Sequence, residues 1–174
     1  TRLSFESAML RLGGDVIGFA DAQTSSVAKG ETVADTARMV SNYADLIVLR
    51  NPLAGAAKVM SMYSSIPVIN GGDDSHRHPT QTLTDLYTIM KCKGRISGLK
   101  VGILGDLKFG RTAHSLAYGL SRFGAELVHI APEPLRMPDC VNHRLKHVYG
   151  TEPYEAESIE EVIGELDIVY VTRI

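Results

Sequence analysis

The sequence predicts an α/β fold, with parallel sheets covered by helices. Two observations carry this prediction: short apolar or β-branched runs typical of buried strands alternate with segments of helical periodicity, and the two kinds of segment repeat as βα units. The chain has 174 residues, of which 44% are hydrophobic and 22% are charged. This composition is ordinary for a globular protein, and the length is enough for one large or two small domains.

The first half of the chain begins with a helical pattern. Apolar residues at helical spacing predict a helix over residues 3–12, which Gly13 and Gly14 close. A β-branched pair then predicts a strand over residues 16–19, and a polar loop follows over residues 21–30. Four further elements continue the alternation: a helix over residues 31–43, a strand over 46–49, a helix over 54–63 and a strand over 67–70.

The second half repeats the same alternation. Pro79 is suited to the first turn of a helix, which continues at helical spacing until Gly94 ends it. Strands are predicted over residues 100–104, 126–130 and 167–171. The helices predicted between them cover residues 111–123, 139–148 and, as a short element, 158–165.

The charge balance and the cysteines exclude several classes of protein. Eighteen Lys and Arg residues against twenty Asp and Glu residues give a net charge of -2, so there is no basic field for nucleic acid or an anionic membrane. Any bound anion must therefore be held by a local cluster. Cys92 and Cys140 are far apart, which favours a reducing compartment over a disulfide or a zinc site. No apolar run reaches the roughly 18 residues that span a bilayer. We expect a cytoplasmic protein, with an organellar form left open.

Polar and charged residues gather in two segments where a predicted strand gives way to a helix. The first is NGGDDSHRHPTQ, residues 70–81, and the second is GDLKFGRTAHS, residues 105–115. Open α/β sheets bind anionic ligands at such junctions, because the helix N-terminus presents free N–H groups there. The two segments therefore predict two halves of one anion site.

These segments, together with TRLSFE at residues 1–6 and VLRNP at residues 48–52, resemble the transcarbamoylase family along the whole chain. The aspartate branch of the family is indicated by KFGR at residues 108–111, where ornithine-type members carry an asparagine-rich segment. The resemblance implies a carbamoyl-phosphate domain over residues 1–79 and an aspartate domain over 80–174. It also implies that part of each domain lies outside the chain.

The resemblance assigns a first group of residues to carbamoyl phosphate. An isolated His78 would be interpreted as a helix cap, but it lies in the HPTQ signature, whose His and Gln (here Gln81) contact the carbamoyl group. Arg50 would otherwise be an exposed arginine at a strand end, where a guanidinium can donate two parallel hydrogen bonds to phosphate. Thr1 matches the end of a phosphate-binding segment whose earlier residues, including a catalytic arginine, precede residue 1.

A second group belongs to the loop TSSVAKGE, residues 24–31. Taken alone, this segment is a solvated, serine-rich loop. The resemblance makes it the loop that crosses to a neighbouring subunit, where Lys29 and either Ser25 or Ser26, with Ser25 preferred, complete the neighbour's site. It therefore implies a homotrimer with shared active sites, and it leaves the presence of regulatory subunits open.

Two arginines form the third group. Arg111 and Arg173 stand at the ends of predicted elements and would by default be surface charges. In the family pattern they hold the two carboxylates of aspartate, since a dianionic substrate needs paired cations. Arg173 belongs to the beginning of the family's TR-x-Q motif.

The implied reaction transfers the carbamoyl group from carbamoyl phosphate to the α-amino group of L-aspartate, giving N-carbamoyl-L-aspartate and phosphate in de novo pyrimidine biosynthesis. Thr1, Arg50 and His78 would stabilise negative charge on the carbonyl oxygen. Gln81 would orient the carbamoyl nitrogen, while Arg50 and Lys29 stabilise the leaving phosphate. The departing phosphate would accept the proton, and no cofactor is needed.

Two alternatives remain: a transcarbamoylase for another amine, and a catalytically silent homologue that acts as a binding or assembly subunit.

Two weaker motifs suggest a nucleotide site and a metal site, and neither is supported. VGILGD at residues 101–106 lacks the full G-x-G-x-x-G pattern of a nucleotide site. His143 and His147 are four residues apart, but basic residues lie between them, so a solvated helix face is favoured over a metal site. We therefore expect no metal.

Overall fold

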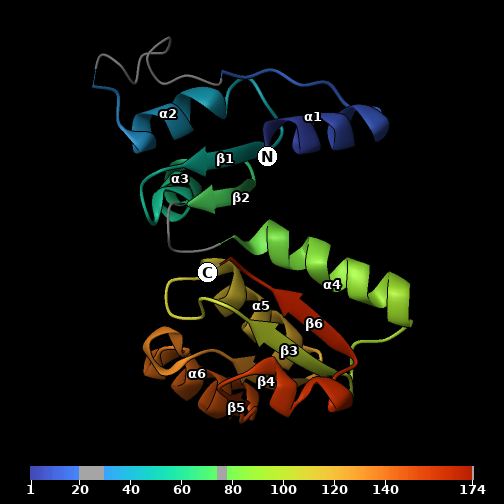
Figure 1. Cartoon of the computed structure of the whole chain (residues 1–174). Helices are drawn as coiled ribbons and strands as arrows, with labels where there is room; N and C mark the ends of the chain where they lie inside the picture. The colour runs from blue at the N-terminus through green and yellow to red at the C-terminus, as the bar shows by residue number, and fades with distance from the viewer. Residues whose placement is uncertain (20–29, 74–77, 174) are drawn as a thin grey trace. The chain divides into compact units, whose positions relative to one another are not determined.

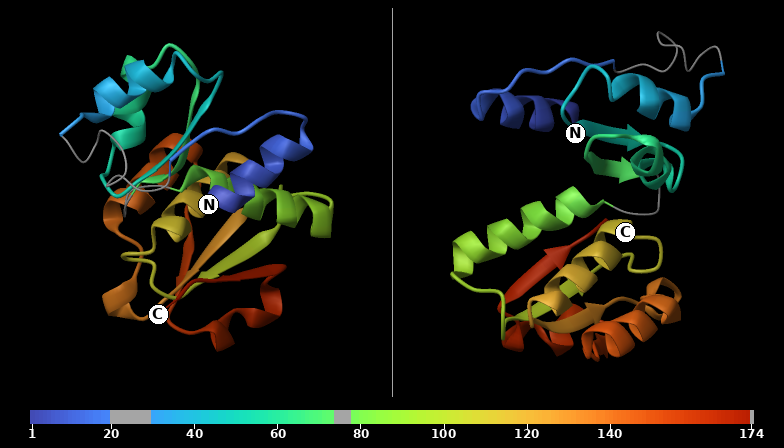
Figure 2. Two further views of the ribbon diagram at one scale, coloured as in Figure 1. Left: turned by 90° about the horizontal axis from the view of Figure 1, so that it is seen from above. Right: turned by 180° about the vertical axis from the view of Figure 1, so that it is seen from behind.

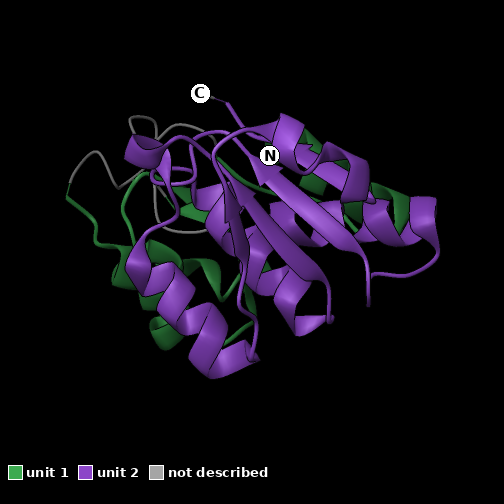
Figure 3. Ribbon diagram, turned by 60° about the horizontal axis from the view of Figure 1, so that its bottom comes forward, with its two compact units in different colours: residues 1–76 green, residues 77–174 purple. Residues whose placement is uncertain are grey.

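The computed structural model describes residues 1–19, 30–73 and 78–173. The chain forms two compact units, residues 1–76 and 77–174, which Figure 3 shows in different colours. The sequence analysis puts a domain boundary at residues 79–80, and the substrate that each unit binds stays a prediction. Among the described residues, no helix is both long and apolar enough to cross a membrane.

Unit 1 is built on two parallel strands (Figure 1). Its elements in chain order are α1 (Arg2–Arg11), α2 (Val33–Val40), β1 (Ile47–Asn51), α3 (Ala56–Tyr63) and β2 (Val68–Asp73). Ile47 pairs with Val68 at one end of the ladder and Asn51 pairs with Asp73 at the other. Because the strands are parallel, their carboxyl ends meet at the same edge, beside the residues predicted to bind phosphate.

The core of unit 1 is small. Ala37 of α2 and Met60 of α3 pack with Ile47 of β1, and all three are buried. In contrast, α1 has no buried residue, and its Leu3 is 81% exposed. Helices α2 and α3 therefore carry most of the packing in the described part of this unit.

The strand predicted over residues 16–19 is wrong. Residues 14–19 form neither helix nor strand, and Ile17 and Phe19 are exposed. Strand propensity depends on packing against a neighbouring strand. In the described part of unit 1, β1 and β2 form a two-stranded sheet, which leaves the segment without such a neighbour.

Unit 2 contains a four-stranded parallel sheet in the order β5-β4-β3-β6. Its helices are α4 (Pro79–Lys93), α5 (Arg111–Arg122) and α6 (Asp139–Tyr149). Its strands are β3 (Lys100–Leu104), β4 (Glu126–Ile130), β5 (Tyr154–Ala156) and β6 (Ile168–Val171). Three short 3-10 helices complete it: η3 (Glu133–Leu135), η4 (Ile159–Glu161) and η5 (Ile163–Glu165).

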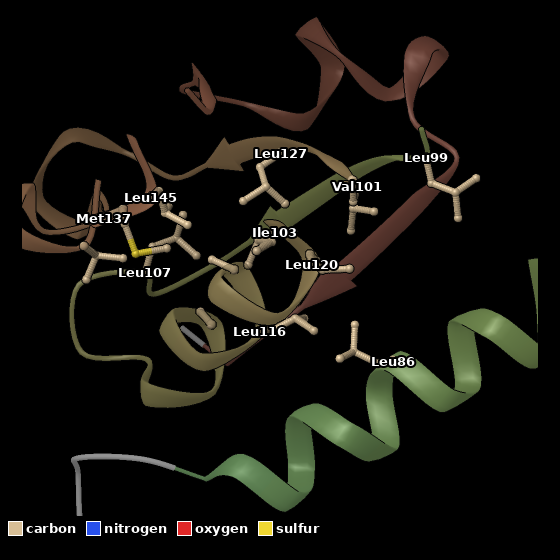
Figure 4. Packing of buried hydrophobic residues seen from close by; sticks show 14 of the residues in the cluster. Leu86, Leu99, Val101, Ile103, Leu107, Leu116, Leu120, Leu127, Met137 and Leu145 are labelled. Carbon is tan, nitrogen blue, oxygen red and sulfur yellow. The ribbon is translucent and has the colours of Figure 1, made fainter. Parts of the chain in front are cut away.

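The main core of unit 2 lies between one face of the sheet and helices α4, α5 and α6 (Figure 4). Val101 and Ile103 of β3 contribute from the sheet, while Leu116 and Leu120 contribute from α5, and all four are fully buried. Helices α4 and α5 lie side by side in both views of Figure 2. Gly119 permits this approach, because a Cβ there would stand 2.7 Å from the Thr82 side chain.

The predicted elements of unit 2 are confirmed, with corrections at its edge. The predicted helix over residues 158–165 is instead the two 3-10 turns η4 and η5. Ile159 of η4, and Val162 between the two turns, belong to the second, smaller apolar cluster of this unit. Strand β5 and η3 were not predicted. Three-residue elements give too few positions for a periodic pattern, and β5 carries a glutamate in its centre.

His129 is a buried polar residue whose titration bears on the stability of unit 2. His129 on β4 is 2% exposed, and neither ring nitrogen has a hydrogen-bond partner among the described residues. Burial, with a smaller contribution from the nearby His114, lowers the pKa of His129 to about 4. The folded protein therefore holds a neutral imidazole at pH values where an unfolded chain, with a histidine pKa of about 6.5, is protonated.

This difference predicts a loss of stability on acidification. Below about pH 6.5 the unfolded state binds a proton that the folded state does not, so the free energy of unfolding falls by about 2 kcal/mol by pH 5 and about 3 by pH 4 from this residue. In His129→Phe that part of the pH dependence should disappear, as measured by urea unfolding between pH 4 and 8. The exposed His147→Gln is the control and should unfold like the wild type. An unchanged pH slope in His129→Phe would contradict the prediction.

Candidate functional site

The candidate site in unit 1 begins with a contact between two residues far apart in the chain. Arg50, near the end of β1, donates from Nη1 to the Thr1 hydroxyl at 2.8 Å and to the Gly71 carbonyl at 3.4 Å. Thr1 is the N-cap residue of α1, so Arg50 lies beside the N-terminus of a helix. A guanidinium and free helix N–H groups together suit an anion.

Gly71 leaves little room for a side chain beside this contact. A Cβ at residue 71 would stand 3.2 Å from the Thr1 methyl carbon and 3.3 Å from the Leu49 carbonyl oxygen, tighter than ordinary packing. A side chain there would require Thr1 or the β1 backbone to shift by a few tenths of an ångström. Gly71 of NGGDD thus has a local reason that concerns packing around the predicted phosphate residues.

Asp73 at the end of β2 is a supporting residue that the sequence analysis missed. It is 3% exposed, and its Oδ2 accepts a hydrogen bond from the Gly55 amide at 2.9 Å, while Oδ1 accepts from Asn70 Nδ2 at 3.1 Å. Gly55 caps the N-terminus of α3. The carboxylate therefore joins the N-terminus of α3 to the carboxyl end of β2.

In unit 2, His78 is the N-cap residue of α4. Its Nδ1 accepts a hydrogen bond from the Gln81 amide at 3.3 Å, and Pro79 occupies the first helical turn. A ring nitrogen that accepts from a backbone N–H carries no proton, so the neutral imidazole has its proton on Nε2. The cap therefore prepares His78 as a hydrogen-bond donor through Nε2, and the capping and ligand-binding interpretations are compatible.

Gln81 is held by a residue one turn further along α4. Its Nε2 donates to Asp85 Oδ1 at 2.9 Å. Burial raises the pKa of Asp85, while the hydrogen bond from Gln81 acts in the opposite direction. The sequence analysis missed Asp85, although a Gln and an Asp four residues apart on a predicted helix are the signal that could have found it.

The loop between β3 and α5 is held by its own aspartate. Asp106 Oδ1 accepts hydrogen bonds from the backbone amides of Lys108, at 3.1 Å, and Phe109, at 2.9 Å. Such a side-chain-capped turn is typical of Asp in loops. It fixes the direction in which the chain enters α5, whose first residue is Arg111.

Arg111 and Arg173 both follow the carboxyl ends of adjacent strands, because β3 pairs directly with β6. The two loops also touch: the Asp106 amide donates to the Arg173 carbonyl at 3.3 Å. Gly105, at φ +127, permits this contact, since a Cβ there would stand 2.6 Å from the Thr172 carbonyl oxygen. The backbone thus brings both arginines to one edge of the sheet.

The predicted residues therefore fall into three sets. Thr1 and Arg50 are in direct contact in unit 1. His78 and Gln81 form one turn of α4, and the two arginines share the edge of the unit 2 sheet. Ser25 and Lys29 lie outside the described residues.

The described residues contain no group of three or more His, Cys, Asp or Glu side chains arranged to hold a metal ion. His143 and His147 do lie together on α6, with ring centroids 4.2 Å apart, and both are exposed. The donors in the three sets of predicted residues are instead guanidinium, imidazole, hydroxyl and amide groups. Such donors suit an oxyanion or a carbonyl group.

Comparison with known proteins agrees with this chemistry. The model of the aspartate/ornithine carbamoyltransferase, carbamoyl-P binding domain family matches residues 1–91, which is more than half of the chain. The chain belongs to the aspartate/ornithine carbamoyltransferase family. The predicted fold class and the family resemblance of the sequence are thereby confirmed.

Individual relatives match over the whole chain. The aspartate carbamoyltransferase catalytic subunit of Methanopyrus kandleri is 56% identical over 174 residues, which are all of this chain and 56% of the relative. The crystallised catalytic subunit of M. jannaschii aspartate transcarbamoylase superposes with a TM-score of 0.91 at 53% identity, over 99% of this chain and 56% of that one.

A third relative was solved with ligands. The aspartate transcarbamoylase of Trypanosoma cruzi, in complex with aspartate and phosphate, has a TM-score of 0.90 at 37% identity, over 100% of this chain and 58% of its own. The chain thus spans little more than half the length of the relatives it matches.

Proposed function

We propose that the protein carrying this chain is an aspartate carbamoyltransferase, which transfers the carbamoyl group of carbamoyl phosphate to the amino group of L-aspartate and thereby serves pyrimidine biosynthesis. The observation that carries this proposal is the 56% identity to a catalytic subunit of that name over all 174 residues. The sets of donors described above supply the chemistry that such a reaction needs.

Unit 1 would bind the phosphate group. Arg50 and Thr1 lie in hydrogen-bond contact at the N-terminus of α1, where a dianion gains charge-assisted hydrogen bonds and a favourable helix dipole. Lys29 would assist the leaving phosphate, by family resemblance. The same resemblance makes the departing phosphate the acceptor of the proton that aspartate loses.

The first turn of α4 would bind the carbamoyl group. Attack by the amine places negative charge on the carbonyl oxygen, and the Nε2 proton of His78 would meet that charge. Thr1 and Arg50 would act on the same oxygen. The Gln81 carboxamide would orient the carbamoyl nitrogen, and positioning of this kind can supply a large part of a rate enhancement.

The loops after β3 and β6 would bind aspartate. Its two carboxylates call for two cations on one side of a binding site, and Arg111 and Arg173 leave adjacent strands at the same sheet edge. A guanidinium binds a carboxylate through two parallel hydrogen bonds. An amine with a single carboxylate would pair with only one of the two arginines. This supports aspartate over an amine with a single carboxylate.

Assembly and location are also proposed from the family. The loop with Ser25 and Lys29 would complete the site of a neighbouring subunit in a homotrimer, in a cytoplasmic protein. The proposal leaves open whether regulatory subunits bind to this homotrimer.

The test is a reaction assay with the protein at its full natural length. Incubation with carbamoyl phosphate and ¹⁴C-aspartate should give labelled N-carbamoyl-aspartate, and phosphate should be released in equal amount. Ornithine and other amines are tested beside aspartate. Faster turnover of another amine would replace the proposed substrate, and binding of carbamoyl phosphate without turnover of any amine would favour the silent homologue.

A further inference from the structure

We propose that Asp85 is a positioning residue that fixes the orientation of the Gln81 carboxamide, and that this orientation selects carbamoyl phosphate over acetyl phosphate. The inference rests on the proposed function and extends it to a residue that does not itself touch the substrate. It starts from the hydrogen bond of 2.9 Å between Gln81 Nε2 and Asp85 Oδ1.

The hydrogen bond allows one orientation of the carboxamide. An ionised carboxylate accepts hydrogen bonds and has none to donate, so only the NH₂ end of Gln81 can face Asp85. The carboxamide oxygen, Oε1, must then point the other way. A glutamine without such a partner can turn over and present either end to a ligand.

The exposed end of the carboxamide decides which ligand fits. A carbamoyl group carries an NH₂ group, and Oε1 can accept a hydrogen bond from it. An acetyl group carries a methyl group in the same position and has no hydrogen to donate. A site built to hydrogen-bond an N–H group rejects the analogue that lacks it, because the acceptor is then left unpaired. The fixed Gln81 therefore provides selectivity between two acyl phosphates of nearly equal size.

Asp85 is poorly suited to a purely structural role. Its second oxygen, Oδ2, is shielded from solvent and has no hydrogen-bond partner among the described residues. Burial also raises its pKa, so the charged form costs free energy in this position. A leucine or an asparagine would fill the site without that cost, so stability alone gives no reason for a carboxylate.

The surroundings of Asp85 connect it to the edge predicted to bind aspartate. Tyr170 on β6, whose pKa is raised by burial, lies close enough to feel the charge of Asp85, and its hydroxyl accepts a hydrogen bond from Thr112. Thr112 follows Arg111, and Tyr170 stands three residues before Arg173. The charge of Asp85 thus acts on a residue of β6, the strand that leads to Arg173.

The experiment compares two ligands that differ only at the group in question. Phosphonoacetamide carries the NH₂ group, and acetonylphosphonate carries a methyl group instead. Calorimetry at pH 8, where the carboxyl group is ionised, should show that the wild-type protein prefers phosphonoacetamide. In Asp85→Leu we expect this preference to fall by about tenfold or more, because Gln81 is free to turn over.

Further variants make the test specific. Asp85→Asn keeps an oxygen that can accept from Gln81, so it should retain more of the preference than Asp85→Leu. Asp85→Ala, which also removes the acceptor, replaces the leucine variant if that protein fails to fold. Thr88→Leu changes an exposed residue on the same helix and should behave like the wild type. The ratio of kcat/KM for carbamoyl phosphate and acetyl phosphate should follow the ratio of binding constants.

The outcomes separate the inference from the proposed function. A wild-type protein that binds neither phosphonate and uses neither acyl phosphate contradicts the proposed function itself. A wild-type protein that prefers phosphonoacetamide, together with an Asp85→Leu or Asp85→Ala protein of unchanged preference, contradicts the role of Asp85 and leaves the proposed function standing.

Discussion

Replacing His78 with asparagine should lower kcat for carbamoyl transfer by about 10²- to 10³-fold while changing the affinity for carbamoyl phosphate far less. Removal of one donor to a developing oxyanion has effects of this size, because the charge exists only in the transition state. The donor in question is the Nε2 proton, which His78 holds because its Nδ1 accepts from the Gln81 amide.

Asparagine is the informative substitution because His78 has a second role. It is the N-cap residue of α4, and asparagine is among the best capping residues, whereas alanine is poor and typically costs about 1 kcal/mol of stability. Both variants should lose turnover, but only His78→Ala should also lose stability in urea unfolding. His143→Asn, on the exposed face of α6, is the control. Normal turnover in His78→Asn would remove the imidazole from the catalytic group.

Long periodic elements could be predicted from the sequence, and their physical basis is local. Helix α4 has a proline in its first turn and a glycine in the left-handed conformation at its end, Gly94 at φ +73. Strands β3 and β4 have the predicted bounds because their apolar runs are buried in the centre of the sheet. The segment at residues 16–19 was wrongly predicted, because its residues favour a strand but no partner strand is available to it in the described part of unit 1.

The site was predictable in its chemistry but not in its contacts. The sequence motifs indicate which residues carry the donors. However, the hydrogen bond between Arg50 and Thr1 joins residues that are 49 positions apart, and no local sequence pattern predicts it. Asp73 was missed because its partner Gly55, at the N-terminus of α3, lies 18 residues earlier in the chain. Supporting residues of this kind depend on tertiary packing, which a single sequence does not display.

The prediction for the aspartate side concerns Arg111. Replacing it with alanine should raise the KM for aspartate by about 30-fold or more, because losing one partner of a desolvated, charge-assisted pair costs about 2 to 5 kcal/mol. Binding of carbamoyl phosphate, measured by calorimetry, should stay almost unchanged. The reason is structural: Arg111 follows the β3 loop in unit 2, at the edge it shares with Arg173.

Arg122 provides a matched control, since it lies at the opposite end of the same helix and is exposed. Arg122→Ala should leave both constants near their wild-type values, so that a general effect of removing a positive charge from α5 is excluded. Arg111→Lys keeps the charge but loses the paired hydrogen bonds, and its KM for aspartate should lie between those of the wild type and Arg111→Ala. If Arg111→Ala lost affinity for carbamoyl phosphate instead, the assignment of this sheet edge to aspartate would be wrong.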